Sequence, residues 1–145
     1  MKPQHFTTTI LVDQSPLEVF NAINNVRGWW PGDITGETDK PQAEFTYAVP
    51  EKHYAKQKIT EFIPGKKIVW HVLESALGFV KDKSEWQGTD IVFEITPKEG
   101  KTEVQFSHLG LSPKFECFQA CSKGWTMLIN KNLSKLIATS ETKPN

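Results

Sequence analysis

The feature that most constrains this chain is an amphipathic helical pattern near its end, from Ser112 to about Thr139. It opens with Ser112-Pro113, a capping serine followed by a proline in the first turn, which is a common helix start. Apolar residues then recur at helical spacing: Phe118, Cys121, Trp125, Leu128, Ile129, Leu133 and Leu136. Because the pattern from Glu44 to His108 is β throughout, this apolar stripe can be buried only against a sheet.

Alternation of apolar with polar residues predicts the strands, which cover about 5–12, 44–49, 53–62, 67–74, 85–96 and 101–108. A short helix follows the first strand, since Ser15-Pro16 with Glu18 forms a capping box with proline at the first helical position. The chain is therefore predicted to be one α+β domain over residues 1–145. Its curved antiparallel sheet, of about six or seven strands, wraps around the long C-terminal helix, with short helices after the first strand.

Two adjacent tryptophans follow the short helix. Neighbours on a regular helix lie about 100° apart around its axis, so Trp29 and Trp30 cannot both point into one core from such a helix. We expect one to fill the core and the other to line an opening or cover the sheet edge. The polar, breaker-rich stretch Pro31–Ala43 reads as a long loop near that entrance, of the kind that often acts as a lid or binding element.

Charge excludes some functions. Lys plus Arg equals Asp plus Glu at 17 each, and Arg27 is the only arginine, so nothing indicates binding to nucleic acid or to an anionic membrane. The N-terminus lacks the apolar core of a signal peptide, and no stretch reaches membrane-spanning length, which predicts a cytoplasmic protein. In a reducing compartment Cys117 and Cys121 are expected to be free thiols.

Five motifs in order along the chain resemble a known family: Trp29-Trp30, residues 64–70, residues 85–89, residues 106–111 and residues 121–125. Together they are similar to the START-like (SRPBCC) helix-grip superfamily, and within it to bacterial homologues of the activator of the heat-shock protein 90 ATPase. The resemblance implies a cavity between the long helix and the concave sheet that often holds a small apolar molecule. The superfamily also includes polyketide cyclases and co-chaperone domains, so the resemblance does not choose one function.

The expected cavity would need apolar walls with a few polar groups to orient a guest. The residues predicted to line it are Trp29, Trp30, Phe45, Tyr47, Phe79, Phe93, Phe106, His108, Cys121 and Trp125. The alternative is that these side chains simply meet and fill a solid core, as aromatic residues at regular spacing usually do.

His108 lies at an inward strand position just before the final helix. A neutral imidazole there could bind a ligand or shuttle a proton, or it could be structural and bond a backbone carbonyl in the turn at 109–112. Tyr47 is the one obvious partner for acid–base catalysis, because the assigned inward faces carry no Asp or Glu. Cys117, Cys121 and His108 match no zinc signature, and we expect no metal or other cofactor.

These residues leave three functional hypotheses. The first is a non-catalytic domain that binds a small hydrophobic or amphipathic molecule. The second is a protein-interaction module of the co-chaperone or stress-response type, with a chaperone or other protein as partner. The third is a small cyclase- or hydrolase-like enzyme centred on His108 and Tyr47. Both faces of the strand around His71 are apolar, so the direction of that side chain stays open.

Overall fold

The computed structural model describes residues 6–30, 33–49, 53–77, 88–109 and 118–140. Seven strands form one antiparallel sheet in the order β1-β7-β6-β5-β4-β3-β2. Their bounds are β1 Phe6–Val12, β2 Asp33–Gly36, β3 Glu44–Val49, β4 His53–Ile63, β5 Lys67–Leu77, β6 Asp90–Lys98 and β7 Lys101–Leu109. The predicted antiparallel helix-grip architecture is confirmed.

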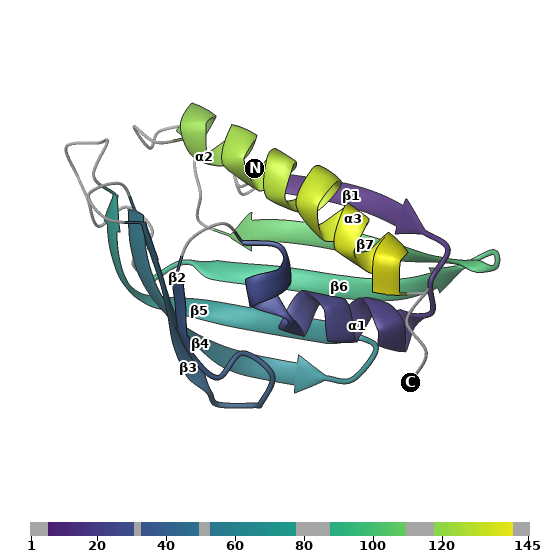
Figure 1. Cartoon of the computed structure of the whole chain (residues 1–145), viewed down its shortest axis with the longest axis horizontal. Coiled ribbons are helices and arrows are strands. Elements are labelled where there is room, and N and C mark those ends of the chain that lie inside the picture. Colours follow the sequence, from purple (N-terminus) through teal and green to yellow (C-terminus); the bar gives the residue numbers. More distant parts are fainter. Residues whose placement is uncertain (1–5, 31–32, 50–52, 78–87, 110–117, 141–145) are drawn as a thin grey trace, which may run out of the picture.

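Two helical segments cover one face of this curved sheet (Figure 1). The first comprises α1 (Pro16–Asn24) and the short 3₁₀ helix η1 (Val26–Gly28). The second is the C-terminal helix, made of α2 (Phe118–Thr126), the π-helical segment η2 (Met127–Leu133) and α3 (Ser134–Ser140). In the described part of the chain, none of the helices combines the length and apolar character needed to cross a membrane.

The predicted capping box sets the start of α1. The Ser15 side chain accepts a hydrogen bond from the backbone N–H of Glu18 at 3.2 Å, and the Glu18 carboxylate accepts one from the N–H of Ser15 at 2.9 Å. Two of the free N–H groups at the helix start are thus satisfied. Val19 and Ile23, four residues apart on one face of this helix, are fully buried.

The inward faces of β6 and β7 follow the predicted alternation. Ile91 and Phe93 on β6, and Val104, Phe106 and His108 on β7, are all completely buried. Direct pairing places Phe93 opposite Phe106 and Ile91 opposite His108, so these side chains point to the same face. That face is the concave one, beneath the C-terminal helix.

The C-terminal helix buries Trp125, Ile129, Leu133 and Ile137, which are each four residues apart. In a regular α-helix a step of four residues overshoots one turn by about 40°, so such a row would drift away from the sheet. The π segment has wider turns with i→i+5 hydrogen bonds, and these offset the drift. The sequence pattern predicted the helix and its apolar face but not this segment, and Leu128 and Leu136 are only partly buried.

One segment interpreted from the sequence as loop is a strand. Residues 33–36 are not loop: they form the edge strand β2, with Ile34 paired to Tyr47. Four residues are too few to show a clear alternation in sequence.

Candidate functional site

The predicted wall residues come together on the concave face of the sheet. Eight of them are at most 6% exposed: Trp29, Trp30, Phe45, Tyr47, Phe93, Phe106, His108 and Trp125. Phe79, and the side chain of Cys121, lie outside the described residues. Trp70, at an inward position of β5, joins the same group and is fully buried.

Trp30 connects the sheet to the C-terminal helix. Its ring centroid lies 4.3 Å from that of Tyr47, 5.4 Å from Trp125 and 6.0 Å from Trp70, in edge-to-face arrangements. Trp29 stacks on Trp70 at 6.2 Å. Both adjacent tryptophans are therefore in the core, where the sequence suggested only one. The reason is that η1 ends at Gly28, so Trp29 and Trp30 do not stand on a regular helix.

His108 is held by two side chains. The indole N–H of Trp125 donates to its Nδ1 at 3.0 Å, and its Nε2 lies 2.8 Å from the Thr89 hydroxyl oxygen. Because an indole nitrogen can only donate, Nδ1 must be the unprotonated acceptor. A neutral ring then carries its proton on Nε2, and this N–H donates a hydrogen bond to the hydroxyl oxygen of Thr89.

This geometry favours the structural interpretation of His108 over the catalytic one. Both ring nitrogens are engaged within the fold, and protonation of Nδ1 would set two donors against each other. Two side chains hold the ring in the described structure, and the expected carbonyl partner in the turn at 109–112 falls on residues that lie largely outside it. Thr89, which immediately precedes β6, was not identified from the sequence.

The other half of the suggested acid–base pair is also constrained. Burial raises the pKa of the Tyr47 phenol, which therefore stays protonated at neutral pH. Ring contacts connect it to His108 through the indoles of Trp30 and Trp125. His71 points elsewhere: it is partly exposed, with Nδ1 2.7 Å from the Asp90 carboxylate.

Gln57 is the most unusual polar residue of the concave face, and the sequence analysis missed it. It lies on β4 between Ala55 and Ile59, and all three are fully buried. Neither its Oε1 nor its Nε2 has a hydrogen-bond partner in the described structure. The alternation of Ala55, Gln57 and Ile59 along one strand was the signal that could have identified it.

Two indole nitrogens share this property. Nε1 of Trp30 and Nε1 of Trp70 are buried and without a partner within the described structure. Gln57 pairs directly with Phe45 on β3, and the Phe45 ring lies 5.0 Å from that of Trp70. We call the buried aromatic side chains of the concave face, together with Gln57, the aromatic wall. It carries three polar groups that make no hydrogen bond in the described structure, those of Gln57, Trp70 and Trp30.

Comparison with known families gives this arrangement its context. The family model described as "Activator of Hsp90 ATPase homolog 1-like protein" matches residues 13–138. The chain belongs to this family. The wider superfamily, START-like (SRPBCC), commonly binds ligands in a cavity, and the resemblance inferred from the sequence motifs is confirmed. A search of curated proteins found no match.

Several solved structures are similar to this family member. An Aha1 dimer from Colwellia psychrerythraea has a TM-score of 0.72 and 21% identity, covering 91% of this chain and 95% of that one. A Mesorhizobium loti protein has a TM-score of 0.72 and 13% identity over 92% and 98% of the two chains. A Nitrosomonas europaea protein has a TM-score of 0.71 and 12% identity over 99% of each. At these identities the likeness establishes the fold alone.

Proposed function

We propose that the protein binds a small amphipathic molecule on the concave face of the sheet, against the C-terminal helix. Aromatic side chains supply the apolar walls, and Gln57, Trp30 and Trp70 supply the polar groups that orient the guest. Such a combination of apolar walls with few polar groups is typical of small-molecule sites.

The single observation that carries this proposal is the buried amide of Gln57. A buried polar group without a partner costs about 1–3 kcal/mol, and Gln57 has two such atoms. A purely structural core would be as well filled by a leucine at this position. A glutamine is useful there when something else brings it a donor and an acceptor.

A guest with both an aromatic body and a hydroxyl group fits these requirements. Its body would part the edge-to-face rings around Trp30, and its hydroxyl would bond the Gln57 amide. A site built to bond a hydroxyl discriminates strongly against the analogue that lacks it, because the buried polar group is then left unpaired.

The test compares 2-naphthol with naphthalene by isothermal titration calorimetry, on the wild type and on Gln57→Leu. We expect the wild type to prefer 2-naphthol and Gln57→Leu to lose that preference. The variant should also be more resistant to urea, because two unpaired atoms are removed. If Gln57→Leu binds 2-naphthol as well as the wild type does, or if neither compound binds the wild type, the proposal is wrong.

A further inference from the structure

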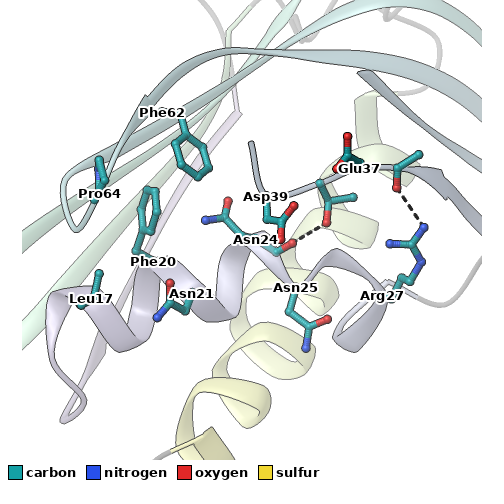
Figure 2. Close-up of a pocket in the computed structure, with 12 residues that line it drawn as sticks. Leu17, Phe20, Asn21, Asn24, Asn25, Arg27, Glu37, Asp39, Phe62 and Pro64 are labelled. Atoms are coloured by element: carbon teal, nitrogen blue, oxygen red, sulfur yellow. Dashed lines mark hydrogen bonds between the residues drawn. The ribbon is translucent and has the colours of Figure 1, made fainter. Parts of the chain in front are cut away.

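A second pocket lies away from the aromatic wall. It has a volume of about 740 Å³, within the range of small-molecule sites. Residues of α1, of η1, of the connection between β2 and β3, and of the end of β4 with its following turn line it (Figure 2). Its described lining includes no residue of the C-terminal helix, so it is separate from the site proposed above.

One side of this pocket is apolar. Leu17 and Phe20 come from α1, while Phe62 and Pro64 come from β4 and its turn. The rings of Phe20 and Phe62 meet edge to face, with centroids 4.9 Å apart. These four side chains form a surface on which the body of an apolar ligand can pack.

The pocket lining also contains an unsatisfied buried acceptor, next to the apolar residues. Asn24 is only 5% exposed, and its Oδ1 has no hydrogen-bond partner in the described structure. Figure 2 shows its amide lying between the rings of Phe20 and Phe62 on one side and Asp39 on the other. The terminal torsion of an asparagine is broad and roughly two-fold, so a turn of the amide can present this oxygen to the pocket.

The backbone around Asn24 is already fixed. The Thr38 hydroxyl donates to the Asn24 carbonyl oxygen at 2.6 Å, which ties the β2–β3 connection to α1. Arg27 donates from Nη2 to the carbonyl oxygens of Ile34 and Gly36, at 3.1 and 3.0 Å. The guanidinium therefore secures the edge strand, and it forms no direct ion pair with Glu37 or Asp39 in the described structure, although its positive charge lies in the same pocket lining.

The two carboxylates that line the pocket differ in whether another side chain pairs with them. Glu37 pairs with Lys40 at 2.8 Å. Within the described structure, no hydrogen bond or ion pair engages the carboxylate of Asp39. The polar end of the pocket thus offers an exposed carboxylate with no direct side-chain partner in the described structure, next to a buried amide oxygen that lacks a donor.

We propose that this pocket binds a small organic cation, with an ammonium or guanidinium head on an apolar body. The head donates to Asn24 Oδ1 and to the Asp39 carboxylate, and the body packs on Phe20 and Phe62. Hydrogen bonds to charged groups contribute about 1.5–3 kcal/mol each, so the charge of the head decides affinity.

The probe is 4-phenylbutylamine, with 4-phenylbutanol as the matched neutral compound, and calorimetry at low salt gives the dissociation constants. We expect the amine to bind the wild type at least about tenfold more tightly than the alcohol. Asp39→Asn should reduce this preference to near unity, and Asn24→Leu should weaken amine binding further. Glu103→Gln removes a carboxylate from β7, outside the pocket lining, and should leave both constants unchanged.

Equal binding of amine and alcohol to the wild type would overturn the proposal, as would an undiminished preference in Asp39→Asn. Asp39 is exposed, so its variant tests the proposal even if Asn24→Leu does not fold. The variant Gln57→Leu distinguishes binding in this pocket from binding on the aromatic wall. It should leave amine binding unchanged, and loss of amine binding in that variant would place the cation on the aromatic wall instead.

Discussion

The indole N–H of Trp125 donates a hydrogen bond to Nδ1 of His108 at 3.0 Å, which joins the C-terminal helix to β7 in the middle of the core. Both residues are almost completely buried, at 2% and 0% exposed. The bond fixes the tautomer of the imidazole and, through Nε2, the position of Thr89. The helix is thus held to the sheet by a specific polar contact as well as by apolar packing.

Trp125→Phe should destabilise the fold by about 1–3 kcal/mol beyond the loss of ring volume, because Nδ1 of His108 is then buried without a donor. Urea unfolding measures the change. His108→Leu alone and the double variant complete a thermodynamic cycle. We expect a coupling of about 0.5–3 kcal/mol between the two sites, and simple additivity would show that the bond does not stabilise the protein.

Tyr47→Phe should make the protein less sensitive to alkali. Burial raises the pKa of Tyr47 in the folded state above its value of about 10 in the unfolded chain. The unfolded state therefore loses its proton first, and the stabilisation present below about pH 10 is lost as the pH rises towards the folded pKa. Urea unfolding between about pH 8 and pH 11 should show a steeper fall for the wild type than for Tyr47→Phe. Parallel curves would contradict this account.

Two glycine-to-alanine substitutions should have opposite effects. Gly36 has φ of 105°, and a Cβ there would lie 2.5 Å from the Glu44 carbonyl oxygen, so Gly36→Ala should cost about 1–3 kcal/mol and loosen the β2–β3 pairing. Gly124 is in the exposed part of α2 with open space around it, so Gly124→Ala should stabilise by about 0.5–1 kcal/mol. Thermal unfolding of both variants measures the two changes in stability. If Gly36→Ala were more stable than the wild type, the backbone at residue 36 would not be strained by a side chain.

Sequence patterns predicted the strands other than β2, the cap of α1 and the concave placement of Phe93, Phe106 and His108, because period-two alternation and capping chemistry are local properties. They did not predict what depends on residues distant in the chain. The partners of His108 are 17 and 19 residues away and meet it only through sheet pairing and helix docking.

Local irregularity explains the other differences. The π segment keeps the buried residues of the C-terminal helix, which are four apart, facing the sheet. The sequence did not show which of the helix's apolar residues are the buried ones, so this segment could not be predicted. The Trp29–Trp30 pair departs from helical geometry after η1, which lets both indoles enter the core. Gln57, by contrast, was visible in the sequence as a polar residue at an inward position of a strand, and only its lack of partners needed the structure.

Native mass spectrometry of the protein purified from its own host shows whether the aromatic concave face holds a small amphipathic guest through Gln57. We expect a wild-type mass increased by one small molecule, which is absent from Gln57→Leu and still present in Asp39→Asn. A wild-type mass equal to that of the bare chain, or an adduct retained equally by Gln57→Leu, would contradict it.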